Sequence, residues 1–248
     1  MLAACEKDDD VNNPPKDSSP LLKSLIGSYI DTPTSNDKIK SWVLQAPEDK
    51  PWLNVYLALT GSPDYEPVRI QPLQNDTEEN NPEALKKAAK YDSLAMAHKD
   101  ITYDRYTDFQ IPDCLYRRTT AIHVVSDADY DSEHPAGTYL DDIINIRFTS
   151  AEDYLATGYS SRSTYLGETT WALLYVPGYV SDDDFWLSEN LAEFNQIQRK
   201  LIQFSFTFVL DKGPDQTGEH HFTFTYMNED GLVLTSKTPK FKINSDTF

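Results

Sequence analysis

The chain has 248 residues, of which 39% are hydrophobic and 12% aromatic, and its formal net charge is −18. This length is sufficient to bury a sizeable core, and the many aromatic residues exclude a largely disordered chain. The excess of 40 acidic over 22 basic residues repels nucleic-acid phosphates and anionic lipid head groups. A nucleic-acid partner is therefore not expected, and no apolar run is long enough for a transmembrane helix.

The chain begins with a segment that predicts a flexible tether. Residues 6–20 are rich in Asp, Asn, Pro and Ser and contain one apolar side chain, Val11. Such a segment cannot offset the conformational entropy that is lost on ordering. The expected organisation is an N-terminal segment with this tether over residues 1–20 and a β-sandwich-like globular domain over residues 21–248. A subdivision near residues 115–200 is the alternative.

Cys5 lies in a motif that predicts a lipid anchor. Leu-Ala-Ala-Cys at residues 2–5 resembles the lipobox of bacterial lipoprotein signal peptides, in which the cysteine thiol receives a diacylglycerol. The Lys and Asp residues at 7–10 resemble the export signal of Bacteroidetes surface lipoproteins. The resemblance implies that the upstream signal peptide has been trimmed and that the protein is displayed on the outer membrane. The alternatives are an ordinary acidic tail or a disulfide with Cys114.

The first part of the expected domain combines strands with one helix. Alternating apolar residues over 53–59 predict a strand, and residues 68–70 predict a shorter one. A helix is expected over residues 82–98, with Asn81 as its N-cap and Pro82 at its first position. The stripe that should pack on a sheet consists mainly of Leu85, Ala88, Ala89, Ala95 and Met96.

The middle of the chain predicts more strands and another helix. Apolar runs over residues 119–125, 143–148 and 170–176 are typical of buried or half-buried strands. Apolar residues at helical spacing over 187–197 predict a helix, with Ser188 as its N-cap.

The last third of the chain alternates most clearly. Residues 204–210 and 222–226 place aromatic side chains on one face, and a strand over 232–235 follows across Asp230-Gly231, a pair suited to a type I′ turn. Antiparallel strands with one apolar face are typical of a sandwich. The predicted fold is mainly β, an Ig-like antiparallel β-sandwich with helical insertions. An α+β fold is the alternative.

One acidic loop is a candidate metal site. Asp127, Asp129 and Asp131 have a spacing with which a tight loop could wrap a hard cation such as Ca²⁺. The loop departs from the EF-hand pattern, because Ser132 stands where that pattern requires glycine. The alternative is a solvated acidic loop without a cofactor.

A second candidate site is aromatic. Trp186 follows an acidic segment that contains Asp184, and Tyr179 lies just before it. Exposed aromatic faces beside carboxylates suit the binding of a glycan, whereas the alternative is that these aromatic residues belong to the core.

The sequence contains no nucleophile elbow, phosphate loop or dinucleotide fingerprint. The adjacent histidines His220 and His221 point to opposite faces of a strand and cannot share a metal from that strand alone. The predicted function is therefore that of a non-enzymatic surface lipoprotein, anchored in the outer membrane by its lipid. It would act in adhesion or as a binding accessory to an outer-membrane protein complex. The alternatives are a glycan-capturing lipoprotein and an extracytoplasmic hydrolase.

Overall fold

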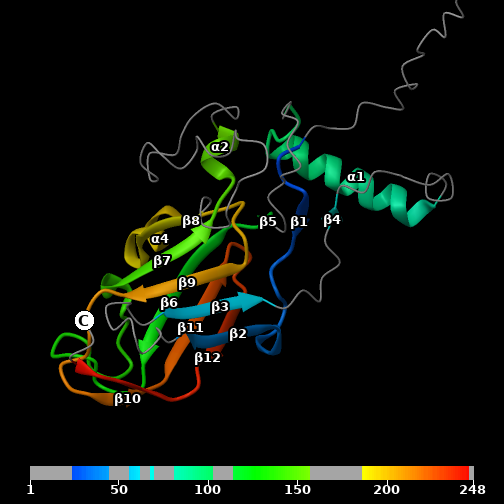
Figure 1. Cartoon of the computed structure of the whole chain (residues 1–248). Coiled ribbons are helices and arrows are strands. Elements are labelled where there is room, and N and C mark those ends of the chain that lie inside the picture. The colour runs from blue at the N-terminus through cyan, green and yellow to red at the C-terminus, as the bar shows by residue number, and fades with distance from the viewer. Residues whose placement is uncertain are drawn as a thin grey trace, which may run out of the picture.

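The structure is a computed structural model, and it describes residues 24–44, 56–61, 68–69, 81–102, 114–156 and 186–245. Within these ranges the chain is mainly β, and its two largest sheets form a sandwich (Figure 1). The predicted mainly β, sandwich-like fold is confirmed. The strand expected over 170–176 lies outside the described residues, as do Cys5, Tyr179 and Asp184.

The larger sheet has five strands in the order β2-β3-β9-β7-β8, and all neighbouring strands are antiparallel. The strands are β2 (Ile39–Leu44), β3 (Tyr56–Gly61), β7 (Ile144–Thr149), β8 (Trp186–Asn190) and β9 (Ser205–Leu210). Alternation sets its inner face: Leu57 lies opposite Phe208, and both side chains are fully buried. The predicted alternation of the apolar residues in β3, β7 and β9 is thereby confirmed.

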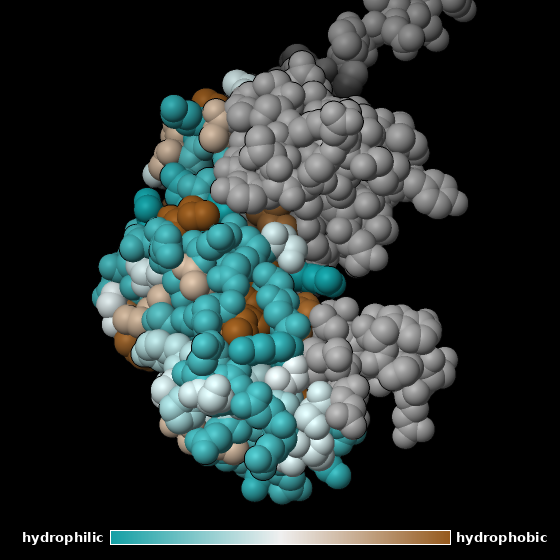
Figure 2. Space-filling view, turned by 90° about the vertical axis from the view of Figure 1, so that its left-hand side faces the viewer, coloured by the Kyte–Doolittle hydropathy of each residue, from teal (hydrophilic) through white to brown (hydrophobic). Residues whose placement is uncertain are grey.

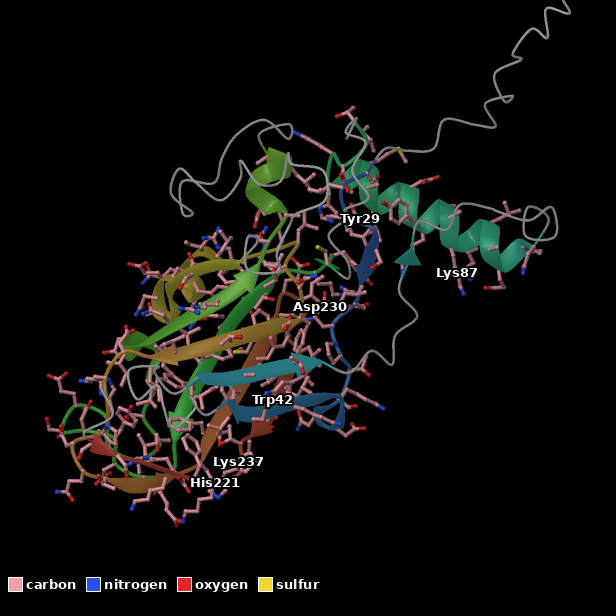
Figure 3. The ribbon with its side chains drawn as sticks, in the orientation of Figure 1. Tyr29, Trp42, Lys87, His221, Asp230 and Lys237 are labelled. Carbon is pink, nitrogen blue, oxygen red and sulfur yellow. The ribbon has the colours of Figure 1, made fainter. Side chains whose placement is uncertain are left out.

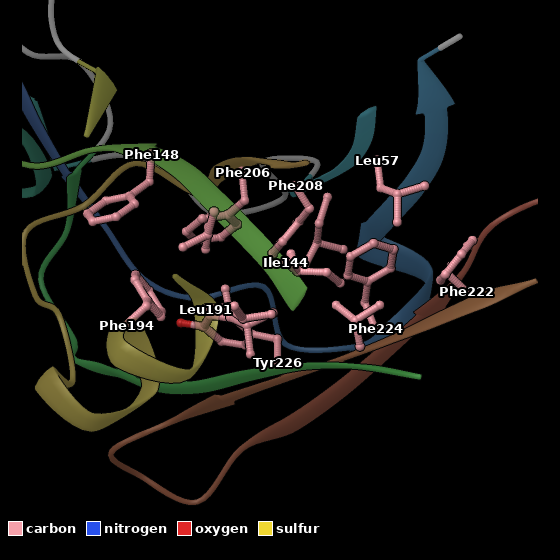
Figure 4. Packing of buried hydrophobic residues seen from close by; sticks show 14 of the residues in the cluster. Leu57, Ile144, Phe148, Leu191, Phe194, Phe206, Phe208, Phe222, Phe224 and Tyr226 are labelled. Atoms are coloured by element: carbon pink, nitrogen blue, oxygen red, sulfur yellow. The ribbon is translucent and has the colours of Figure 1, made fainter. Parts of the chain in front are cut away.

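The facing sheet has three strands in the order β12-β11-β6. They are β6 (Thr119–Ser126), β11 (Phe222–Asn228) and β12 (Val233–Lys237). Phe222, Phe224 and Tyr226 of β11 are fully buried. The ring of Phe224 lies 4.9 Å from that of Phe208 in the opposite sheet, so aromatic side chains join the two layers (Figure 4). β6 and β7, which come from the predicted 115–200 subdivision, contribute to these same two sheets.

The turn between β11 and β12 differs from the predicted type I′ turn. That turn needs positive φ at both central residues, but only Gly231 of the pair has one, at 79°. Asn228 determines the geometry: its backbone oxygen accepts from Gly231 N at 3.0 Å, and its side chain accepts from the backbone N–H groups of Asp230 and Leu232. The asparagine side chain therefore closes a longer loop.

Helix α4 (Leu191–Ile197) packs against β6, β7 and β8 and closes one side of the sandwich. It begins later than predicted, because residues 186–190 pair with β7 as a strand. The predicted N-cap at Ser188 is therefore wrong. Asn190 caps the helix, its side chain accepting from Ala192 N at 3.0 Å. From α4, the side-chain amide of Asn195 hydrogen-bonds both backbone groups of Ile122 and covers the edge of β6.

A smaller unit lies at one end of the sandwich. Its three-stranded sheet has the order β4-β1-β5, and β1 pairs with β5 in parallel, unlike the antiparallel pairs of the sandwich. The elements are β1 (Ser28–Ile30), β4 (Val68–Arg69), β5 (Cys114–Leu115) and α1 (Pro82–Ala97). Cys114 is fully buried in this unit.

The predicted start of α1 is confirmed, because the Asn81 side chain accepts from Glu83 N at 3.0 Å. Its predicted apolar stripe is partly wrong: Leu85 and Met96 are 46% and 55% exposed. Tyr91 and Ala95 are the buried residues instead, because Tyr91 faces β1, where its ring packs at a tilt of 55° against the ring of Tyr29.

The remaining elements are short. They are η1 (Asn36–Lys38), η2 (Asp141–Ile143), α2 (Glu152–Ala156), β10 (Gly218–His220) and β13 (Phe241–Ile243). Hydrophilic side chains cover most of the coloured face in Figure 2, and apolar ones gather only in small separate patches. Among the described residues, no helix combines the length and the apolar character needed to cross a bilayer.

Candidate functional site

The three aspartates of the predicted Ca²⁺ loop bind separate protein donors. Asp127 accepts from His221 N at 2.7 Å, and Asp129 accepts from Ala136 N at 2.8 Å. Asp131 accepts from other groups, described below. These carboxylates therefore hold the backbone of the loop, as aspartate side chains commonly do in turns.

Asp131 is the buried member of the three, and its two carboxylate oxygens face a lysine and a histidine. Lys212 Nζ lies 2.8 Å from one carboxylate oxygen, and His134 Nδ1 lies 2.7 Å from the other. In the described part of the chain, no three His, Cys, Asp or Glu side chains are grouped so as to hold a metal ion. The three carboxylates therefore act within the loop itself, and Ca²⁺ binding by them stays a prediction.

His134 lies between two carboxylates and is buried. Its Nδ1 faces Asp131, and its Nε2 lies 3.0 Å from Asp142 Oδ1. Both ring nitrogens must carry a hydrogen to donate to both carboxylates, so this geometry favours the imidazolium form. Burial opposes the charge, but the hydrogen bonds to Asp131 and Asp142 outweigh burial and raise the pKa of His134 above 6.5. The contacts of His134 with Asp131 and Asp142 thus hold the loop in its folded conformation.

The raised pKa of His134 leads to a prediction about pH. A group with a raised pKa in the folded state stabilises the protein fully below its unfolded pKa, about 6.5 for histidine. That stabilisation is lost as pH rises through the folded-state pKa of His134. We expect hydrogen exchange of residues 131–142 to accelerate above pH 6.5 by more than the intrinsic exchange rate does. The variant His134→Gln should lack this additional acceleration, and an equal acceleration in both proteins would contradict the prediction.

The predicted aromatic site is placed only in part. Trp186 begins β8, where its backbone lies opposite Thr149. Tyr179 and Asp184 lie outside the described residues. Glycan binding at these three residues stays a prediction.

A different site lies between α1 and α2, which Figure 1 shows at the same end of the sandwich. There a cavity of about 270 Å³ is lined by residues 97–99 at the end of α1, by α2, and by Lys200 and Leu201. Glu152 of α2 accepts from Lys200 N at 3.1 Å, and its other oxygen lies 3.7 Å from Lys200 Nζ. The described residues of the wall thus include His98, two lysines and one glutamate.

The C-terminal end of α1 determines the backbone conformation of Lys99, one of the residues that line the cavity. Asp100 N donates to Ala95 O at 2.8 Å, and Lys99 N donates to Met96 O at 3.1 Å. This pair of bonds forms a Schellman motif, whose left-handed residue is usually glycine. Here that residue is Lys99, with φ of 60°.

Leu201, on the opposite wall, also has a left-handed backbone, with φ of 52°. Such a conformation is costly for a bulky residue and tends to occur at functional sites. Hydrogen bonds on both sides hold it there: Leu201 N donates to Leu115 O, and Ala151 N donates to Leu201 O. Of the three described non-glycine residues with positive φ, two therefore line the cavity.

The His98 ring is held in place by Tyr29. Its ring stacks on Tyr29 at 5.7 Å, and Tyr29 lies on β1 beside α1 (Figure 3). The Tyr29 hydroxyl donates to the fully buried Asp100, whose carboxylate also accepts from the backbone N–H groups of Leu25 and Ile26. Burial, assisted by the charge of Lys200, lowers the pKa of His98. At neutral pH the ring is therefore uncharged, with one donor and one acceptor nitrogen.

Comparison of the chain with protein-family models, with curated proteins and with solved structures finds no significant match.

The arrangement of the cavity residues is suited to binding. It offers charge, hydrogen-bonding groups and an aliphatic wall, while its carboxylate, Glu152, is already engaged by Lys200. Sequence reasoning did not identify this site, because Lys99 and Lys200 lie far apart in the chain and neither belongs to a motif. One signal was available: the predicted helix ends without glycine, with Lys99 at the position that glycine usually occupies.

Proposed function

We propose that this protein is a lipid-anchored, non-enzymatic binding protein of the outer cell surface, and that it captures a small ligand in the cavity between α1 and α2. The observation that carries the capture role is the construction of this cavity: Lys99 and Leu201 in left-handed conformations, and His98 braced by Tyr29. The proposed lipid anchor and the proposed location at the cell surface rest on the motif at residues 2–10.

The engagement of two acid/base groups, His134 and Glu152, supports a binding role over the alternative of a hydrolase. A general acid or base must reach the proton that it transfers. Both nitrogens of His134 bind carboxylates, and Glu152 is paired with Lys200. These groups therefore serve to hold the structure of the protein.

The anchor is tested in the full-length precursor. Cys5→Ala should move the protein from the membrane fraction to the soluble fraction, because one acidic chain without a lipid has little affinity for anionic membranes. Globomycin, which blocks the lipoprotein signal peptidase, should make the unaltered precursor accumulate. Retention of the Cys5→Ala protein in carbonate-washed membranes would contradict the anchor.

Capture is tested on the purified chain with a panel of monosaccharides, sugar acids and amino acids, using saturation-transfer NMR. At least one compound should bind, and Ala156→Trp, which places a large side chain at the cavity wall, should abolish that signal. Leu85→Trp, on the exposed side of α1, is the matched control and should leave binding intact. Absence of any signal, or binding that Ala156→Trp does not change, would overturn the capture role.

A further inference from the structure

We propose that the exposed face of the Tyr139 ring is a second binding site, on which a neutral pyranose ring of a glycan stacks. The site lies at the outer face of the three-stranded sheet and shares no residue with the cavity between α1 and α2. Three properties of the described residues support it: an exposed aromatic ring that is held in place, hydrogen-bonding groups beside that ring, and a local charge that repels acidic ligands.

Tyr139 is the most exposed large hydrophobic residue in the described part of the chain, at 58%. One face of its ring packs on the ring of His123, with 4.3 Å between the ring centres and 17° between the ring planes. Because more than half of the residue is exposed although this face is covered, the opposite face is open to solvent. An open aromatic face attracts the C–H groups of a sugar ring, since its quadrupole is negative there.

The position of the Tyr139 ring is fixed by the residues beneath it. His123 Nδ1 lies 2.6 Å from Asp141 Oδ2, and the buried Asp141 also accepts from Val124 N at 3.1 Å. The backbone of Tyr139 is held as well, because it forms a β-bridge with Val125. A ring that is fixed before binding loses little conformational entropy when a ligand stacks on it, so more of the contact energy contributes to affinity.

Groups that can hydrogen-bond to sugar hydroxyls lie beside the ring. Ile122 and Val124 of β6 are buried, so His123 between them points to the outer face of the sheet. Thr225 of β11 lies opposite His123, and Thr235 of β12 lies opposite Thr225, so two hydroxyl side chains continue the row on the same face. Among the described contacts, only Nδ1 of the His123 ring is hydrogen-bonded, and Nε2 is not buried. Nε2 is therefore left to accept from a sugar hydroxyl or, in the charged ring, to donate to one.

The charge around Tyr139 favours a neutral sugar over an acidic one. Residues 127–142 are rich in Asp and Glu and contain no Lys or Arg, so this segment repels a carboxylate or sulfate on a ligand. A quaternary ammonium ion is the other ligand that an aromatic face attracts, but proteins usually surround it with several aromatic rings. Among the described residues, Tyr139 packs on one ring, that of His123. A single open face is matched to one pyranose ring.

The test is saturation-transfer NMR of the purified chain with lactose, cellobiose and maltose as neutral probes, and with glucuronate and tetramethylammonium as charged ones. At least one neutral sugar should bind, and the strongest saturation should fall on the C–H groups of one of its rings, because these contact the tyrosine. Glucuronate should bind more weakly than that sugar. Tighter binding of glucuronate, binding of tetramethylammonium alone, or absence of binding by all three neutral sugars would overturn the inference.

Variants locate the bound sugar and separate this site from the cavity. Tyr139→Ala should weaken binding about 10-fold, the affinity that an aromatic stacking contact contributes, and should leave thermal stability nearly unchanged because the residue is exposed. Tyr139→Phe keeps the ring and should retain binding. Trp42→Ala, at another exposed aromatic residue, is the matched control and should change nothing.

Ala156→Trp, at the cavity wall, should also leave this binding intact. Loss of the sugar signal in Ala156→Trp, with Tyr139→Ala unaffected, would place the sugar in the cavity. That outcome would overturn the Tyr139 site while supporting the proposed capture function. Binding that depends on Tyr139 and not on Ala156 would support the Tyr139 site whether or not the cavity binds a ligand.

Discussion

Glu189→Gln is expected to destabilise the protein by about 3–5 kcal/mol, the usual cost of removing one partner of a buried ion pair. Glu189 of β8 and Arg199, which follows α4, have side chains only 5% and 4% exposed. Arg199 donates from Nε and from one terminal nitrogen to the two carboxylate oxygens, at 3.2 and 2.7 Å. Its guanidinium also lies 5.8 Å from the centre of the Phe148 ring. Without the carboxylate, the guanidinium would stay charged in a low-dielectric site.

Urea denaturation monitored by tryptophan fluorescence measures this effect. Two further variants show whether the loss comes from leaving one buried charge without its partner. The double variant Glu189→Leu with Arg199→Met should recover most of the loss, because a buried pair replaced by apolar side chains is often neutral. Glu219→Gln breaks the exposed pair with Lys240 and should cost less than about 1 kcal/mol. A loss of that small size in Glu189→Gln as well would show that water reaches Arg199.

Local patterns were sufficient to predict the sandwich. Alternation in β3, β9 and β11 is a property of consecutive residues, and burial follows it directly: Leu57, Phe208 and Phe224 all face the core. The N-cap of α1 was equally predictable, because Asn81 and Pro82 act on neighbouring backbone groups. These predictions required no knowledge of which strands are paired.

Features that depend on tertiary partners were not predictable. Leu187 to Ile197 has the spacing of a helix, yet pairing of residues 186–190 with β7 overrides that preference over its first part. The Asp131 side chain has the spacing of a Ca²⁺ ligand, but Lys212 approaches it from a distant part of the chain. Likewise, the cavity joins Lys99 to Lys200 across a separation that no local pattern reports.

Asp100→Ala is expected to have the second large effect, and this effect should be local. The Asp100 carboxylate accepts from Leu25 N at 2.7 Å, from Ile26 N at 2.9 Å and from the Tyr29 hydroxyl at 3.3 Å. A hydrogen bond to a charged group contributes about 1.5–3 kcal/mol, and each buried donor left unsatisfied adds a penalty. The segment that carries β1 should therefore come away from the end of α1 at a cost of about 3–5 kcal/mol.

Hydrogen exchange by mass spectrometry resolves where this loss occurs. Protection should fall in residues 25–30 and in α1, while β9 and β11 keep theirs, because their contacts lie within the sandwich core. The helix end itself should persist, since the backbone bond from Asp100 N to Ala95 O does not involve the side chain. Uniform loss of protection across both regions would show instead that the two regions unfold as one cooperative unit.

Asp100→Ala should also affect the cavity, through Tyr29 and His98. Asp100 holds Tyr29, and Tyr29 stacks on His98 in the cavity wall. Asp100→Ala should therefore weaken ligand binding although Asp100 does not line the cavity. Tyr29→Phe isolates the effect, because it keeps the stacked ring and loses only the hydroxyl bond: binding should be nearly retained and stability reduced by about 1 kcal/mol. Equal loss of binding in both variants would indicate that the hydroxyl bond, not the position of β1, orients His98.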